Sequence, residues 1–306
     1  MDKRTTFTQS ELDRIAEAIK MSGAVRTQAR PSAGRALAEA LARAGVDISA
    51  IGGASKQRAD ATRDAAAQRQ AYQRANAAEL EALRGLAGAN LLEIMDAPFL
   101  IWEFPRPDDV FIDSGIQPLD SFVRVLINDI FSHDTRTFVF YFLWRNPSPA
   151  PASVVFATSL VFNGECSVTG APGIFSGTKV DLNVSASLFI TRWSGWGKDP
   201  NTGDGTVVDT TGATGGGNAV TLHAEGGHIF QGPGSASQSV SFLPINCGYR
   251  NLIVPGDAVA LLGVQCAIFY AYDDGGGDIE DLVSVDFSNA GRFIGCPRMI
   301  VLSTPA

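Results

Sequence analysis

The pattern of hydrophobic and polar positions divides the chain into two parts. In the first part, apolar residues recur at the three- and four-residue spacing of an amphipathic helix, as at Leu12, Ile15 and Ile19. From Phe99 onward, apolar and polar residues alternate with the period of two that is typical of strands. This switch predicts a helical region over residues 1–95 and a β domain over residues 96–306.

The first helix has a well-defined start. Thr8 and Glu11 have the spacing of a capping box, and Phe7 is placed to pack on Leu12 as a hydrophobic staple. We expect this helix to end at Gly23, a second helix to run from Pro31 to Gly45, and a third to begin near Ser55.

The third helix is rich in Ala and Arg, and residues 56–71 contain no large apolar side chain. Such a helix buries little surface by itself. We therefore predict that it contacts another copy of the chain through its small faces and its lone aromatic residue, at Ala61, Ala65 and Tyr72. The alternative is a helix that lies over its own β domain.

The clearest strand runs from Val180 to Thr191, where one face is apolar and the other polar, with Phe189 as the exception. Three further runs are apolar on both sides, which indicates a central strand or a subunit contact. These runs are 137–144, 154–162 and 258–272, the last with Gly263 as a candidate β-bulge.

Gly- and Pro-rich turns separate about ten such runs, with no helical pattern between them. The second part therefore predicts an antiparallel β-sandwich, jelly-roll-like in its connections. The whole chain is α+β by segments, a helical region followed by a sandwich.

Composition supports this division and restricts the classes of function that the chain could have. Charged residues make up only 18% of the chain, whereas it contains 32 glycines and 18 phenylalanines, a mixture typical of sheets joined by tight turns. Residues 1–95 carry 14 Lys and Arg against 11 Asp and Glu, and the remainder carries 10 against 21. An acidic sandwich argues against nucleic acid as a partner, because phosphate binding needs clustered basic residues.

The beginning of the sequence has no apolar signal-like segment, and no run approaches 18 uninterrupted apolar residues. We therefore predict no membrane span and a cytoplasmic location by default, with extracellular release by a non-signal route left open. The four cysteines are too widely spaced for a zinc site, and we expect free thiols at Cys166, Cys247, Cys266 and Cys296.

Two segments carry residue types that bind metal ions. Asp199, Asn201 and Asp204 bring short oxygen-bearing side chains together in one loop, as calcium requires, although the same residues also make ordinary turns. His223 and His228 flank a short Gly-containing stretch and would meet across a hairpin, as in a zinc site, or would face solvent as polar strand residues.

Trp193 and Trp196 lie at the end of the 180–191 strand, before a polar stretch that we expect to be a loop through Gly217. Aromatic faces at a sandwich rim stack on sugar rings or anchor a protein interface, and they also fill a protein's own core. Carbohydrate is therefore a second candidate partner.

No nucleophile elbow, P-loop or dinucleotide-binding fingerprint occurs in the sequence. The preferred interpretation is a non-enzymatic structural subunit that needs no cofactor and self-associates into a homo-oligomeric shell, tube or filament. The alternatives are a carbohydrate-binding module and a hydrolase whose Ser, His and Asp meet only in three dimensions.

Overall fold

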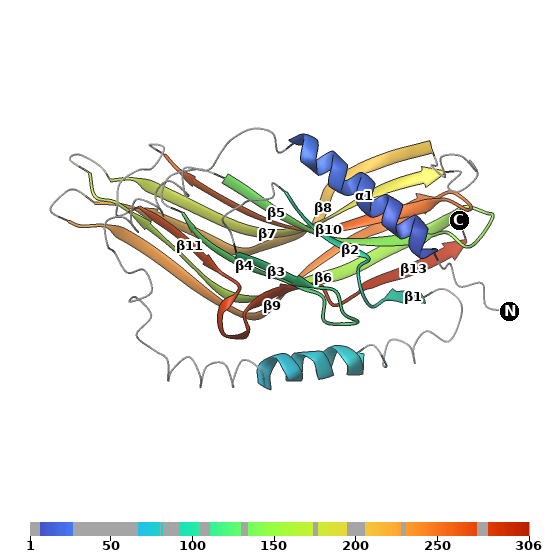
Figure 1. Cartoon of the computed structure of the whole chain (residues 1–306), viewed down its shortest axis with the longest axis horizontal. Helices are drawn as coiled ribbons and strands as arrows, with labels where there is room; N and C mark the ends of the chain where they lie inside the picture. The colour runs from blue at the N-terminus through green and yellow to red at the C-terminus, as the bar shows by residue number, and fades with distance from the viewer. Residues whose placement is uncertain are drawn as a thin grey trace.

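The computed structural model describes residues 7–26, 67–79, 81, 92–104, 111–129, 134–173, 177–194, 206–227, 231–273 and 281–305. Antiparallel strands form two sheets that pack face to face in a sandwich-like arrangement, and helices lie outside them (Figure 1). Among the described residues, no helix is long and apolar enough to cross a bilayer.

The larger sheet, sheet A, contains β1 (Leu92–Met95), β3 (Phe111–Gly115), β4 (Phe122–Asp129), β6 (Ala152–Gly170), β9 (Gly234–Val254), β11 (Leu282–Asp286), β12 (Phe293–Gly295) and β13 (Met299–Pro305). Sheet B contains β2 (Leu100–Phe104), β5 (Asp134–Arg145), β7 (Lys179–Ser194), β8 (Thr206–Glu225) and β10 (Val259–Tyr272). A 3-10 turn, η2 (Asn289–Gly291), precedes β12.

Strand β6 organises sheet A. Along one edge it pairs with β9, and along the other edge it pairs in turn with β13, β12 and β11. Strand β4 lies beyond β11, so sheet A contains the order β4-β11-β6-β9. Sheet B contains the order β5-β10-β7-β8, with β2 beside β5.

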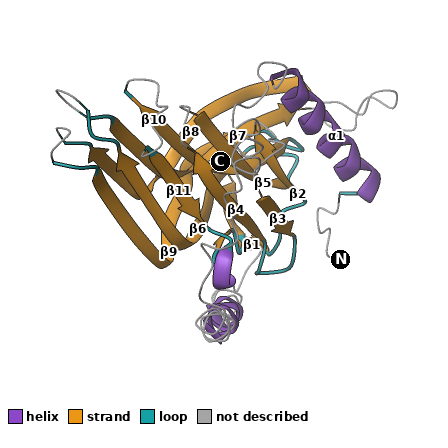
Figure 2. Ribbon diagram, turned by 60° about the vertical axis from the view of Figure 1, so that its left-hand side comes forward, coloured by secondary structure: helices purple, strands orange, loops and turns teal. Residues whose placement is uncertain are grey.

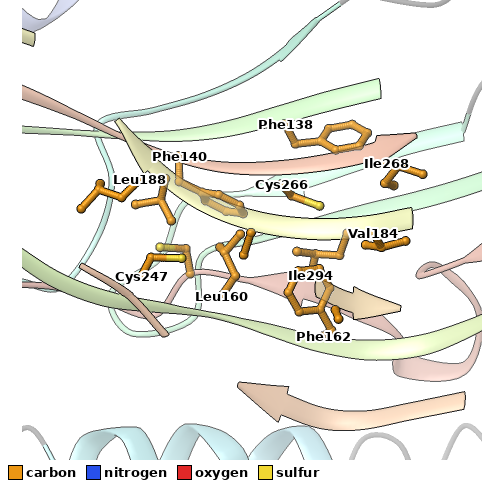
Figure 3. Close-up of a cluster of buried hydrophobic side chains, with 14 of the residues drawn as sticks. Phe138, Phe140, Leu160, Phe162, Val184, Leu188, Cys247, Cys266, Ile268 and Ile294 are labelled. Carbon is orange, nitrogen blue, oxygen red and sulfur yellow. The ribbon is translucent and has the colours of Figure 1, made fainter. Parts of the chain in front are cut away.

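The core lies between the two sheets. Figure 3 shows Phe138, Phe140 and Cys266 of sheet B facing Leu160 and Phe162 of sheet A. The alternation predicted for the 180–191 strand is confirmed, because its inward-facing side chains are buried in this core: Val180, Leu182, Val184, Ala186, Leu188 and Ile190.

Gly263 is not a bulge, contrary to the sequence prediction. Strand β10 keeps an unbroken register past this residue with both β5 and β7. Phe189 lies directly opposite on β7, and a Cβ atom at position 263 would overlap the Phe189 ring. Glycine is needed here because the aromatic ring occupies the space above it.

Helix α1 (Gln9–Arg26) explains why β5 and β10 are apolar on both sides. Ile15 and Ile19 are buried against Val139, Tyr141 and Val259 on the outer face of sheet B. The chain's own helix therefore covers part of the outer face of these strands, around Val139, Tyr141 and Val259.

The predicted capping box is present at the start of α1. The Thr8 backbone N–H donates to Glu11 Oε2 at 2.8 Å, and the Glu11 N–H donates to Thr8 Oγ1 at 3.3 Å. Phe7 and Leu12 pack against the same cluster of outer-face residues. The predicted end at Gly23 is wrong, because the helix continues to Arg26.

From residue 206 onward, the polar stretch expected to be a loop through Gly217 is instead part of strand β8, which pairs with β7. Gly215 and Gly216 adopt positive φ angles, and the β7–β8 register shifts several times nearby. A Cβ atom at Gly215 would overlap the Gly248 carbonyl of β9. The glycines thus allow an irregular strand to pass close to the neighbouring sheet, a feature that alternation in the sequence does not reveal.

Strand β1 begins at Leu92, shortly before the predicted start of the β domain at residue 96. It pairs with β13, and the Trp144 Nε1–H donates to Glu93 Oε2 at 2.9 Å. The second predicted helix, residues 31–45, lies outside the described residues, as does the third up to residue 66.

Candidate functional site

A helical segment, residues 67–79, lies on the outer face of sheet A, on the opposite side of the sandwich from α1 (Figure 2). Five of its residues contact the sheet or the turns beside it: Arg69, Tyr72, Gln73, Asn76 and Glu79. These positions follow the three- and four-residue spacing of one helix face. The segment is therefore docked by one continuous stripe of side chains.

The first contact is a buried ion pair. Arg69 Nη2 lies 3.2 and 3.1 Å from the two carboxylate oxygens of Asp120, and Gln73 Nε2 donates to the same carboxylate at 2.5 Å. The side chains of Arg69 and Asp120 are only 15% and 8% exposed. The Arg69 guanidinium also lies over the rings of Phe122 and Phe293, at 4.3 and 5.1 Å from their centroids. Removing one partner of such a pair costs about 3–5 kcal/mol, because the other charge stays buried.

The second contact is aromatic. The Tyr72 ring lies 5.5 Å from that of Phe242 and 5.6 Å from that of Phe293. Burial raises the pKa of Tyr72 to about 12, and its buried hydroxyl has no hydrogen-bond partner among the described residues. Tyr72 therefore stays neutral at physiological pH and acts as the apolar anchor of the segment.

The last contact is a second ion pair, at the far end of the stripe. Arg298 Nη2 lies 2.5 Å from Glu79 Oε1. The Arg298 side chain is only 9% exposed, whereas that of Glu79 is 57% exposed. Arg298 Nη1 is buried without a hydrogen-bond partner among the described residues. The unpaired Nη1 group weakens the contact between Arg298 and Glu79, because a buried donor without a hydrogen bond carries a desolvation cost of about 1–3 kcal/mol or more.

Two residues beneath the segment have strained backbones. Leu119 has φ of 60° and Phe242 has φ of 48°, in the left-handed region that bulky side chains avoid. The Leu119 carbonyl accepts a hydrogen bond from Asn76, and Phe242 lies at an irregularity in the β6–β9 register. Such conformations cost on the order of 1–3 kcal/mol each and gather at sites that must present a group in a fixed direction.

We name these residues the helix-docking surface: Leu119, Asp120, Phe122, Phe242, Phe293 and Arg298. They come from the turn before β4, from β4, from β9, from β12 and from the residue before β13. They could not be identified from the sequence, because they are far apart along the chain and follow no motif. Tyr72 was predicted to contact another copy, but in the structure its ring packs on Phe242 and Phe293 of the same chain, which is the alternative arrangement.

A groove of about 510 Å³ begins where the helical segment ends. Glu79, Arg250 and Arg298 contribute charged groups to its lining, and Ala157 and Ile300 contribute apolar ones. The pairings of β6 with β13 and β9 place Ile300, Ala157 and Gly248 in one row across the sheet. Because Gly248 has no side chain, the surface of the sheet is recessed at this end of the row.

The next row across the same face is apolar and open to solvent. Leu302 pairs with Leu92 on one side and with Val155 on the other, and Ile253 of β9 lies opposite Ser153, two residues along β6 from Val155. Leu302 is 44% exposed and Ile253 is 48% exposed. We call Leu92, Val155, Ile253 and Leu302 the apolar row.

The structure places only part of the sites predicted from the sequence. The candidate calcium ligands Asp199, Asn201 and Asp204 lie outside the described residues, as do Trp196, Ala61 and Ala65. The backbone of Trp193 pairs with Val259 of β10 and Val207 of β8.

The histidine prediction is also only partly placed. His223 Nδ1 lies 2.8 Å from Asp181 Oδ1, as a cross-strand pair on the exposed face of β7 and β8. His228 lies outside the described residues. Within the part of the chain that the structure describes, no three His, Cys, Asp or Glu side chains are grouped to hold a metal ion.

All four cysteines are free and buried, as the sequence predicted. Burial raises the pKa of Cys247 to about 11 and that of Cys166 and Cys296 to about 12, and it raises the pKa of Cys266 further still. These thiols are therefore core residues that stay protonated at neutral pH.

Comparison with known proteins gives no close relative. No family profile and no characterised protein sequence matches the chain. A CocE/NonD family hydrolase from Staphylococcus aureus aligns at 10% identity and a TM-score of 0.12, over 62% of this chain and 42% of the hydrolase. The structure of infectious bursal disease virus, Gx strain, aligns at 13% identity and a TM-score of 0.12, over 67% of this chain and 47% of the viral chain. The chain thus spans less than half the length of either structure, and similarity this low carries no argument about fold or function.

Proposed function

We propose that this protein is a non-enzymatic structural subunit that self-associates into a homo-oligomeric shell, tube or filament. The contacts are made by the helical arm and by the faces of the sandwich, and no cofactor takes part. A cytoplasmic setting, which keeps thiols reduced, is consistent with the four free cysteines.

The strand order supports a jelly roll as the body of the subunit. Strands β4 to β11 fall into two four-stranded sets, β4-β11-β6-β9 and β5-β10-β7-β8, and successive strands change sheet except at the β7–β8 pair. Two sheets of four strands built from Greek-key connections are the jelly-roll arrangement, which occurs in viral capsid proteins, lectins and cupins. The fold alone does not choose among such functions.

The observation that carries the proposal is the apolar row on the outer face of sheet A. Single exposed apolar residues are common, but contiguous ones mark a protein contact. Leu302, Val155 and Leu92 are direct cross-strand neighbours, and Leu302 and Ile253 each leave nearly half of their surface in solvent. Because Leu302 and Ile253 are already about half buried, complete burial by a neighbouring subunit would contribute roughly 1 kcal/mol for each.

Sedimentation velocity and light scattering at micromolar concentration test the proposal. Wild-type protein is expected to form particles much larger than its mass of 32.3 kDa. Leu302→Glu and Ile253→Glu are expected to shift the distribution toward the monomer. Phe269→Glu is the matched control, because Phe269 is 45% exposed but lies on the outer face of sheet B. A wild-type protein that sediments as a monomer would overturn the proposal.

A further inference from the structure

We infer that the helix-docking surface is a receptor for the 67–79 helix of a second copy of this chain, so that neighbouring subunits exchange arms. This inference rests on the proposed self-association and names the contact that performs it. The partner is identified by the chemistry of the surface, which is complementary to this helix along its whole length.

The surface contacts the helix at five positions. Asp120 receives Arg69 and Gln73, the Phe242 and Phe293 rings receive Tyr72, and the Leu119 carbonyl and Arg298 receive Asn76 and Glu79. Anchors at positions i, i+3, i+4, i+7 and i+10 are the pattern of a helix recognised in a groove. The ion pairs also fix the direction of the helix, because a reversed helix would place Glu79 beside Asp120 and Arg69 beside Arg298.

The docked helix is suited to exchange rather than to permanent attachment. Tyr72 is the only large apolar side chain of residues 67–79, so the contact depends mainly on ion pairs and hydrogen bonds, which another copy of the same helix would make equally well. Arg298 Nη1 has no hydrogen-bond partner among the described residues even when the helix is in place. By contrast, the surface contains the strained residues Leu119 and Phe242, which indicates that it is shaped in advance for its partner.

Chain length permits the exchange. Ten residues, 82–91, connect Glu81 to the first residue of β1. A chain of this length reaches at most roughly 35 Å when extended. This reach is what an arm needs in order to be exchanged between adjacent identical chains.

A charge swap distinguishes the two arrangements. Full-length Arg69→Asp places two carboxylates together, and full-length Asp120→Arg places two guanidinium groups together, so each variant repels its own helix within a chain and between identical chains. When the two variants are mixed, the helix of either copy is attracted to the surface of the other. Only exchange between copies can therefore restore the contact in the mixture.

Sedimentation velocity is measured for wild type, for each variant and for the equimolar mixture. The expected result is that the mixture associates at a concentration about tenfold lower than either variant alone, and that the double variant Arg69→Asp, Asp120→Arg behaves as wild type. If wild type associates but the mixture gains nothing over the single variants, the inference is wrong and the proposed function stands. If wild type is a monomer, both are wrong.

A peptide keeps the test decisive if Asp120→Arg does not fold. Fluorescein-labelled peptide 67–79 is titrated by fluorescence anisotropy into full-length Arg69→Asp, whose own helix is repelled while the surface is unchanged. We expect binding that is at least tenfold tighter than that of the same peptide carrying Arg69→Asp. Equal affinity of the two peptides would show that the surface does not recognise the helix and would overturn the inference.

Discussion

Replacing Gly263 with alanine tests the packing of sheet B against α1. The new methyl group would overlap the ring of Phe189, which lies edge-on to Tyr141 with centroids 6.0 Å apart. Phe189 and Tyr141 belong to the cluster that buries Ile15 of α1. The Phe189 ring would have to move, and α1 would then pack less closely against sheet B.

Forced overpacking of this kind costs about 1–3 kcal/mol. For a domain of 150–250 residues, each kcal/mol lowers the melting temperature by about 2–4 °C, so Gly263→Ala is expected to lower it by roughly 2–12 °C. Differential scanning calorimetry measures this shift. Gly217→Ala is the matched control, because a Cβ atom at that strand glycine meets only Ile245 at 3.8 Å, an ordinary contact.

A double-mutant cycle identifies the cause. In a Phe189→Ala background the added methyl group has no ring to displace, and the further cost of Gly263→Ala should fall to within about 0.5 kcal/mol of zero. The reasoning is refuted if Gly263→Ala melts with the wild type, or if its cost is the same in both backgrounds.

Three further predictions concern α1, the helix-docking surface and the thiols. Thr8→Ala removes the capping hydroxyl and should destabilise α1 by about 1 kcal/mol, measured as faster amide hydrogen exchange over residues 9–19 with no change in β7. An unfolded tyrosine titrates near pH 10, so the contribution of Tyr72 to helix docking, complete below that pH, is lost as pH rises through about 12. The difference in 295 nm absorbance between wild type and Tyr72→Phe should show one phenol ionising there, and a midpoint near 10 would contradict burial of the ring. Finally, the native protein at pH 8 should give no reaction with a thiol reagent, and the denatured, unreduced protein should give four equivalents; two or fewer would mean a disulfide.

Much of the sandwich could be predicted from the sequence, because apolar and polar residues alternate along a strand that has one buried face. Val180, Leu182 and Val184 face the core at every second position, and the pattern is visible without knowledge of the partner strands. The first part of β8, residues 206–217, could not be predicted in this way, because Gly215 and Gly216 interrupt the alternation where the backbone approaches β9, whereas Val220, Leu222 and Ala224 do alternate. The start of α1 was predictable because a capping box is a local contact between Thr8 and Glu11.

The docking of the 67–79 helix was not predictable from its own composition. A segment with one large apolar residue gives no signal of burial, and here burial depends on Asp120 and Arg298, which lie some 50 and more than 200 residues away along the chain. From the sequence, contact with another copy and contact with the chain's own β domain were both open, and neither Asp120 nor Arg298 could be named as a partner. The partner became visible only once folding had brought the turn before β4 next to β12 and β13.

The position of β6 has a consequence for biosynthesis. One edge of this strand pairs with β11, β12 and β13, which the ribosome produces more than a hundred residues after β6 itself. At about 5–20 residues per second, that edge waits on the order of 10 s for its partners. The fold therefore has a high contact order, and an open β edge on the nascent chain is available for aggregation throughout that interval. We therefore expect the chain to depend on chaperones during translation. Once β13 has paired with β6, we expect the folded protein to unfold slowly.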